Sequence, residues 1–313
     1  MTAISIEFRK LPLGLARRRL GPEPMKSLFK SAVRPIAKKK TKGAWYRKWH
    51  LVAIDGTILD VADTPENEER FGRPGNGRSE DKAAFPQARV MGLIECGTHA
   101  IFDAIIGPCS DSENKLTPGL FASLTPGMLL LCDRGFWGYD LWKQAAATGA
   151  DMLWRTKSNV VLPIVKMLPD GSYLSEIRAT KDRKNNKPIT VRVIEYRLDG
   201  IGKETFRLVT TILDHNSAPA RELALLYAER WEIESGFGEV KTHQRGRAGV
   251  LRSKFPETVE QEIWAHLLVH FAVRSLMTDA ATQEGVDPDR TSFINALRIV
   301  RRQLTEPVAF SPR

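Results

Sequence analysis

Cysteine is scarce in this chain, and its few cysteines lack the spacing of a disulfide framework or a zinc site. Only three occur among 313 residues, Cys96, Cys109 and Cys132, and none forms a CxxC pair. Long hydrophobic runs are also missing: the apolar stretch 263–277 carries two histidines and an arginine and is shorter than the ~20 residues that cross a bilayer. No secretory segment is expected either. We therefore expect a soluble protein in a reducing cytoplasm, with no membrane attachment.

Two common binding motifs are absent as well. The region 63–85 contains three glycines in a phosphate-loop-like arrangement, but it has no GxxxxGK[ST] and no strand directly before it. We expect a flexible surface loop there, without nucleotide binding. His266 and His270 are four residues apart, yet no HExxH occurs and their surroundings are apolar. Core histidines are the expectation.

Positive charge is concentrated at the start of the chain. The net charge is +10, and residues 1–48 alone hold fourteen Lys or Arg against two Glu. Such an arm suits phosphate contacts that hold nucleic acid without reading its sequence. A solvated basic tail is the alternative interpretation. Prolines punctuate this stretch, so we expect short helices, the most plausible over 25–37, and no packed domain.

The rest of the chain alternates strand and helix patterns in an order that predicts one mixed sheet. Strands are predicted at 51–54 with a continuation over 57–62, and at 87–96, 99–106, 128–132 and 151–155; helices are predicted at 112–124 and 139–147. This order predicts an α/β fold, a ribonuclease-H-like mixed sheet with flanking helices.

Downstream, the pattern becomes β-rich and basic before it turns helical. Strand-like runs at 160–167, 172–177, 189–196 and 206–213 predict an all-β insertion, and helices are predicted over 217–241 and 258–279. The predicted division is a basic N-terminal arm at 1–48, a catalytic core at 49–156 and 214–280, a β-rich insertion at 157–213 and a C-terminal tail at 281–313.

Three carboxylates stand out against this framework. Alone, Asp55 before a glycine is typical of a hairpin turn, Asp133 of a strand cap and Glu234 of a solvated helix face. Together they change the interpretation, because Asp55 and Asp133 are predicted at the C-terminal ends of core strands, where open sheets bind ligands. Three converging carboxylates suit Mg²⁺ or Mn²⁺. Two such ions roughly 3.5–4 Å apart can serve both the attacking and the leaving oxygen.

The predicted helix carrying Glu234 adds a second feature. Tyr227, Arg230 and Lys241 share its face, because offsets of three, seven and fourteen residues at about 100° per residue return all four side chains to within roughly 60°. One surface is then expected to present a hydroxyl, a guanidinium, a carboxylate and an ammonium. This mixture suits a site that binds a metal with the carboxylate and DNA phosphates with the cations.

The spacing Tyr-x2-Arg-x3-Glu-x6-Lys resembles the signature of the insertion-sequence-4 family of bacterial DDE transposases. Residues 54–57 and 132–136 resemble that family's first and second acidic motifs, and the resemblance covers about residues 15–280. It implies that the divalent metals are bound by Asp55, Asp133 and Glu234. It also implies that transposon-end phosphates are contacted by Tyr227, Arg230 and Lys241.

The reaction implied by the resemblance is nicking at a transposon end, hairpin formation, hairpin opening and strand transfer into target DNA. Its partner is double-stranded DNA, with a homodimer at the synapsed ends, in the bacterial cytoplasm or on the nucleoid. Only 54 residues precede Asp55, so we expect an N-terminally shortened copy. No Trp lies between Trp154 and Trp231 to stack near the hairpin, and Phe206 or Tyr196 is the expected substitute. A non-catalytic DNA-binding remnant and a structure-selective nuclease stay open as alternatives.

Overall fold

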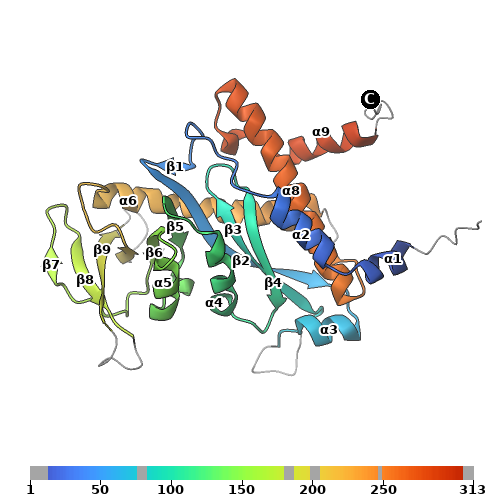
Figure 1. Ribbon diagram of the computed structural model, residues 1–313, viewed down its shortest axis with the longest axis horizontal. Coiled ribbons are helices and arrows are strands. Elements are labelled where there is room, and N and C mark those ends of the chain that lie inside the picture. The colour runs from blue at the N-terminus through green and yellow to red at the C-terminus, as the bar shows by residue number, and fades with distance from the viewer. Residues whose placement is uncertain (1–12, 76–82, 180–186, 198–204, 246–248, 306–313) are drawn as a thin grey trace, which may run out of the picture.

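The computed structural model describes residues 13–75, 83–179, 187–197, 205–245 and 249–305, and its strands form one sheet (Figure 1). The sheet order is β4-β3-β2-β5-β6-β10-β9-β8-β7, and β1 and β11 also pair with β2. The strands are β1 Trp45–Tyr46, β2 Trp49–Val61, β3 Gln87–Glu95, β4 Ile101–Pro108, β5 Met128–Cys132, β6 Asp151–Arg155, β7 Lys166–Met167, β8 Tyr173–Ile177, β9 Ile189–Arg197, β10 Thr205–Thr210 and β11 Val250–Leu251.

The helices cover this sheet and flank its ends (Figure 1). The α-helices are α1 Leu13–Leu20, α2 Glu23–Ala32, α3 Pro65–Phe71, α4 Glu113–Leu116, α5 Tyr139–Ala146, α6 Ala220–Leu226, α7 Glu232–Gly238, α8 Pro256–Glu284 and α9 Phe293–Thr305. Short 3-10 turns are η1 Thr117–Ser123, η2 Arg134–Phe136, η3 Tyr227–Trp231 and η5 Pro288–Arg290, and η4 Glu239–Gln244 is a π-helix.

The centre of the sheet confirms the predicted ribonuclease-H-like mixed architecture. Strands β2, β3 and β4 are antiparallel neighbours, whereas β5 runs parallel to β2 and β6 parallel to β5. All five residues of β5, Met-Leu-Leu-Leu-Cys, are buried. A short, continuously apolar run is typical of a parallel strand covered on both faces, and this one coincides with its predicted bounds.

The strands of the β-rich stretch join the same sheet. Strand β10 pairs antiparallel with β6, and β9, β8 and β7 follow outward in antiparallel order. Inside this part Arg192 is fully buried, where it donates to Asp170, Ser172 and main-chain carbonyls. A buried charge of this kind is stable only when paired and hydrogen-bonded.

Three secondary-structure expectations are wrong. Strand β2 is unbroken over thirteen residues, so Asp55 lies in the middle of a strand and not at its end. The expected loop 63–85 contains helix α3, which is capped by Thr64, whose hydroxyl accepts from the Asn67 amide; Gly77 lies outside the described residues. The expected helix 112–124 is a short α-helix followed by a 3-10 turn.

The long helix α8 forms the side of the molecule against which the N-terminal helices pack (Figure 1). Phe29 of α2 is fully buried with its ring 5.1 Å from that of Trp264 in α8. His270 is fully buried, as the sequence predicted for a core histidine. Among the described residues, no helix is both long and apolar enough to cross a membrane.

Candidate active site

Strand register places the two aspartates side by side. In the parallel pair β2 and β5, Ala53 is the partner of Leu131, and two residues further along each chain come Asp55 and Asp133. Asp133 is still extended, with φ −77° and ψ 167°. Neighbouring strands lie about 4.8 Å apart and side chains two positions along point to the same face, so this register aims both carboxylates at one surface.

The same row of positions continues into the adjoining strands. On one side, Gly92 of β3 is the cross-strand partner of Asp55. On the other, Trp154 of β6 pairs with Cys132, so Arg155 stands next to Asp133. Across the four adjacent strands β3, β2, β5 and β6, the row therefore presents a glycine, two carboxylates and a guanidinium.

Helix α7 is held over this row by its contact with Gly92. A Cβ atom at position 92 would lie 2.8 Å from Cζ of Phe237, so the buried ring of Phe237 fills the space that the missing side chain leaves. Phe237 follows Glu234 by nearly one helical turn. The absence of a side chain on β3 thus brings the helix that carries Glu234 onto the face of the sheet where Asp55 lies.

The electrostatics of Asp55 reflect a crowded, partly desolvated site. Burial is the main cause that raises the pKa of Asp55 to about 6, and the negative charges of Glu113 and Glu234 raise it further. The Gly56 amide, which donates to Asp55 Oδ1 over 2.8 Å, and the Arg230 charge act in the opposite direction. Asp55 and Glu234 therefore lie close enough for their charges to interact.

Asp133 belongs to the same neighbourhood. The thiol of Cys132, fully buried between the aspartates, has its pKa raised first by burial and then by the charges of Asp55 and Asp133. Burial likewise raises the pKa of Tyr227 far above its ordinary value, with Asp133 adding to the effect. Tyr227 donates its hydroxyl proton to the Cys132 carbonyl over 3.1 Å. The segment around residue 227 is thereby fixed beneath the second aspartate.

The expectation that four functional side chains share one exposed helix face is wrong. Tyr227 and Arg230 are buried, whereas Glu234 and Lys241 are exposed. The reason is that the segment is not one α-helix: it passes from α6 through the 3-10 turn η3 and α7 into the π-helix η4, so the angle per residue changes three times. Arg230 reaches Glu234 through an ion pair of 3.6 Å, while Lys241 has no recorded polar partner among the described residues.

Two polar groups at this site escaped the sequence interpretation. Glu113, at the start of α4, has its Oε1 3.0 Å from where a Cβ of residue 56 would be, so it lies on the sheet face opposite to the Asp55 side chain, near enough for its charge to act on Asp55. No strand-end pattern marks it. Arg155 could have been found, because it is the last residue of the fifth predicted strand, beside the position that Asp133 takes after the fourth. Its guanidinium carbon lies 4.4 Å from the ring centre of Phe206, which stacks on Tyr196.

The donor set at this site suits a hard divalent cation. Asp55, Asp133 and Glu234 offer carboxylate oxygens only, the ligands that Mg²⁺ and Mn²⁺ prefer. Among the described residues, no three acidic, cysteine or histidine side chains converge tightly enough to hold a metal ion by themselves. The repulsion that raises the pKa of Asp55 marks negative charge that a cation would neutralise. The carboxylates at this site therefore fit a bound divalent cation.

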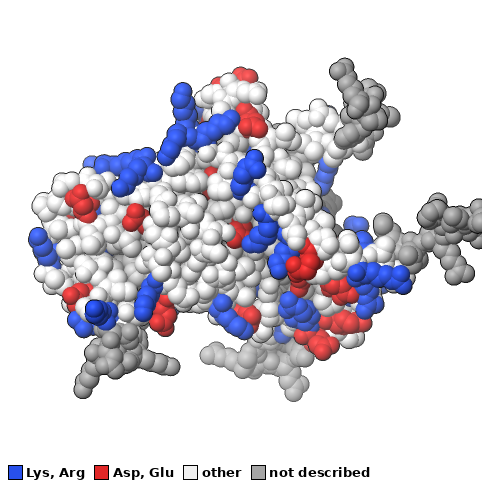
Figure 2. Space-filling view, viewed as in Figure 1, with Lys and Arg blue, Asp and Glu red and all other residues white. Residues whose placement is uncertain are grey.

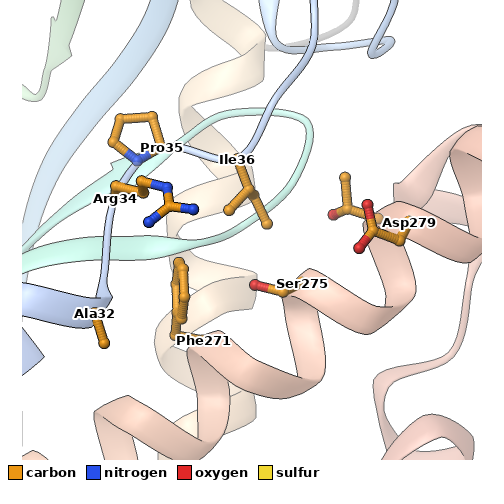
Figure 3. A pocket seen from close by; sticks show the side chains of 8 residues that line it. Ala32, Arg34, Pro35, Ile36, Phe271, Ser275 and Asp279 are labelled. Carbon is orange, nitrogen blue, oxygen red and sulfur yellow. The ribbon is translucent and has the colours of Figure 1, made fainter.

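A hollow elsewhere contains none of these residues. A cavity of about 310 Å³ separates the N-terminal arm from α8, with Arg34, Pro35 and Ile36 facing Phe271, Ser275 and Asp279 (Figure 3). It has no nucleophile next to a base and no paired carboxylates. The candidate active site is instead formed by the row of strand positions and the helix that packs against Gly92.

This arrangement defines a class of enzyme. Two aspartates on adjacent parallel strands of a ribonuclease-H-like sheet, with a glutamate on a following helix, are the arrangement that the sequence resemblance to DDE enzymes predicts. Residues 50–272 match the family model described as "Transposase DDE domain", so the chain belongs to that family.

Its relatives are transposases of bacterial insertion sequences. The transposase InsG for insertion sequence element IS4 from Escherichia coli (strain K12) is 30% identical over 314 residues, covering 95% of this chain and 68% of InsG. The putative transposase InsZ of the same organism is 29% identical over 44% of this chain and 46% of its own length. These matches confirm the predicted resemblance to the insertion-sequence-4 family. A piggyBac transposase synaptic complex with hairpin DNA gives a TM-score of 0.49 at 10% identity, over 82% of this chain and 54% of that one.

Proposed function

We propose that this protein cleaves DNA at transposon ends and joins the ends to target DNA, with Asp55, Asp133 and Glu234 as ligands of two Mg²⁺ or Mn²⁺ ions. The observation that carries the proposal is the shared register of the two aspartates on β2 and β5, with Glu234 held over Asp55 by Phe237. When bound, the cations supply Lewis-acid stabilisation of the negative charge on the phosphoryl oxygens.

The residues of this chain would contribute charge and position. Asp55 is half-buried in the middle of β2, and its carboxylate is held by the hydrogen bond from the Gly56 amide. Glu234 is the mobile partner: its carboxylate is about half exposed and pairs only loosely with Arg230. We infer that Glu234 turns from Arg230 toward the aspartates when cations and DNA are present. The released guanidinium of Arg230 is then available to a phosphate.

Phosphate contacts are proposed for Tyr227, Arg230 and Lys241. Lys241 is exposed and can meet DNA directly, whereas the buried Tyr227 would have to exchange its bond with the Cys132 carbonyl for a phosphate oxygen. Arg155, next to Asp133 in the row, is a further candidate. The stacked rings of Phe206 and Tyr196 beside it support the proposal that an aromatic of the β-rich stretch stacks on a base near the cut.

The finer course of the reaction is also proposed. Hydrolysis nicks one strand at the transposon end, and the freed 3′-hydroxyl attacks the opposite strand to give a hairpin. The hairpin is then hydrolysed, and the new 3′-hydroxyl attacks target DNA. Each step is an in-line phosphoryl transfer without a protein-bound intermediate. Two ends are joined together by a homodimer on double-stranded DNA, in the cytoplasm or on the nucleoid.

Basic residues around β1 support non-specific binding of DNA by the N-terminal arm. Lys and Arg gather along the upper left edge of the molecule, over β1 (Figure 2). The exposed cations of this region are Lys38, Lys39, Lys40, Lys42, Arg47 and Lys48. We also propose that the chain is divided into a basic N-terminal arm, a catalytic core, a β-rich insertion and a C-terminal tail.

The test is a nicking and strand-transfer assay on oligonucleotides that carry the element's terminal repeats. The chain should cut and join them in Mg²⁺ or Mn²⁺, and Asp133→Asn should abolish both steps. Asp140→Asn, an exposed aspartate on α5, is the matched control and should leave both steps unchanged. Binding without cleavage by the unaltered chain would identify the DNA-binding remnant instead. Structure-selective cutting without strand transfer would identify a nuclease.

A further inference from the structure

The helix that carries Glu234 is attached to the rest of the molecule a second time, by a buried ion cluster. Glu239, the residue at which α7 passes into η4, is buried. Its carboxylate accepts from Nε of Arg274 over 2.8 Å, from Nη2 of the same guanidinium, and from Nε2 of His270 over 2.9 Å. A buried carboxylate is stable only when it is paired and hydrogen-bonded, so this end of the helix is held against α8.

His99 joins this cluster to the sheet. It is buried in the turn between β3 and β4, and its Nδ1 lies 2.6 Å from Nη2 of Arg274. Because a guanidinium can only donate, Nδ1 accepts and the ring proton is on Nε2, which lies 3.0 Å from Oδ1 of Asp289 in η5. One imidazole therefore connects the cation that holds Glu239 to η5, from a turn whose two strands belong to the central sheet.

The same turn packs directly against α7. A Cβ at Gly236 would lie 3.6 Å from the carbonyl oxygen of His99 and 3.5 Å from Cδ1 of Ile94. Ile94 and Gly92 are two residues apart on β3, so they point to one face of the sheet, the face on which the Asp55 side chain lies. Helix α7 therefore runs along this face of β3 up to the turn that contains His99.

The main chain of His99 has an uncommon conformation. Its φ is +56°, and only two non-glycine residues in the described part of the chain have a positive φ. This left-handed conformation costs free energy in a residue that has a side chain, and such strain persists where the surrounding structure imposes it, frequently at functional sites. In this conformation the imidazole meets Arg274 while the carbonyl lies against Gly236.

We propose that His99 is a positioning residue for Glu234: its imidazole and main chain fix α7 and η4 on the sheet, so that the Glu234 carboxylate is presented beside Asp55. The inference rests on the proposed function, in which Glu234 is a metal ligand, and adds a residue outside the acidic set. A purely structural role, in which His99 only stabilises its turn, is the competing explanation. A structural role changes the unfolding midpoint alone, whereas a positioning role changes the maximal nicking rate of the folded protein.

The experiment measures nicking by the full chain as a function of DNA concentration, in Mn²⁺ and at a temperature at which every variant is folded. The DNA is the oligonucleotide that carries the element's terminal repeat. His99→Gly accepts the positive φ without strain and removes the imidazole. It should lower the maximal rate by about tenfold and leave the half-saturating DNA concentration within about twofold, because small displacements of a catalytic group reduce the rate and not the affinity.

Two further variants make the comparison specific. His99→Asn places an amide oxygen where Nδ1 of the histidine lies and adopts a positive φ readily, so it should keep at least about a third of the maximal rate. Val191→Ala shortens a buried side chain of β9, which β6 and β10 separate from β5 in the sheet. It should lower the unfolding midpoint and leave the nicking rate unchanged, and thereby controls for lost stability.

The outcomes separate this inference from the proposed function. If the unaltered chain does not nick, the proposed function is overturned and the positioning role with it. If the unaltered chain nicks and His99→Gly reaches the same maximal rate, only the role of His99 is overturned. An equal loss of rate in His99→Gly and His99→Asn would overturn that role as well, and so would an increase in the half-saturating DNA concentration alone. Neither result follows from a helix that is held through the ring nitrogen.

Discussion

Replacing Gly92 with alanine should move the catalytic helix without altering any acidic residue. The added Cβ would lie 2.8 Å from Cζ of Phe237 and 3.4 Å from Cγ2 of Ile101. The distance to Ile101 is an ordinary van der Waals contact, whereas the distance to Phe237 is about 0.6 Å shorter than such a contact. Because Phe237 is buried, we expect the clash to displace α7 from the sheet by a similar amount.

The magnitude follows from that displacement. Overpacking of this size costs about 1–3 kcal/mol of unfolding free energy. Displacement of a catalytic group by about 1 Å reduces a rate by roughly 100-fold, so a shift of Glu234 by half that distance should slow nicking by about tenfold or more. DNA binding should change little, because the cations around β1 are untouched.

The assay compares nicking rates of the unaltered chain, Gly92→Ala and Gly92→Ala with Phe237→Leu. The shorter leucine vacates the space at Cζ, so the double variant should recover most of the rate that the single variant loses. Gly14→Ala, where an added Cβ meets nothing within 4 Å, is the matched control. An unchanged nicking rate and an unchanged unfolding midpoint in Gly92→Ala would refute the reasoning that this contact holds α7 over Asp55.

Three further predictions concern groups around the site. Burial raises the folded-state pKa of Asp55 to about 6 from 3.8, so the charged carboxylate destabilises the metal-free fold above pH 6 and not below pH 4. In EDTA, Asp55→Asn should therefore raise the free energy of unfolding by about 2 kcal/mol at pH 7.5 and leave it unchanged at pH 3.5, measured by thermal unfolding. Arg274→Met should cost about 3–5 kcal/mol in urea denaturation, because it leaves the buried carboxylate of Glu239 without its cation; a loss below 1 kcal/mol would contradict this. Tyr227→Phe should cost about 1 kcal/mol of stability and weaken end-DNA affinity severalfold in a binding titration; unchanged affinity would assign the hydroxyl to the Cys132 carbonyl alone.

The central strands could be predicted from the sequence because each one has a local pattern. The strand 128–132 and the strand 151–155 were predicted with the observed bounds, since a short apolar run flanked by polar residues leaves little freedom in where it starts and stops. Asp133 was located for the same reason. Asp55 was located for a partly wrong reason: it was expected at a strand end, whereas β2 continues past it for six residues. What aligns it with Asp133 is the pairing register, which is a property of two strands together.

The parts that could not be predicted depend on contacts between distant segments. Glu113 has no local feature that distinguishes it, and only the pairing with Arg89 and the space over Gly56 bring it against strand β2, behind Asp55. The breaks in the helix 217–241 likewise follow from packing, because the Tyr227 hydroxyl is held by β5 while Glu239 is held by α8. A helical wheel assumes a constant rotation per residue, whereas the contacts of Tyr227 with β5 and of Glu239 with α8 make the rotation vary along this segment.

The pairing of β10 with β6 has a mechanical consequence. Arg155, the last residue of β6, is also the partner of Leu208 in β10, so the strands that extend the sheet are hydrogen-bonded to the very strand that borders Asp133. The stacked Phe206 and Tyr196 lie on β10 and β9, which are joined to that border by continuous strand pairing, so we expect these strands to move with the sheet as a rigid surface. Fitting a sharply bent substrate to this surface then requires distortion of the nucleic acid, not of the protein, and the energy of that distortion falls on whichever base steps unstack most readily.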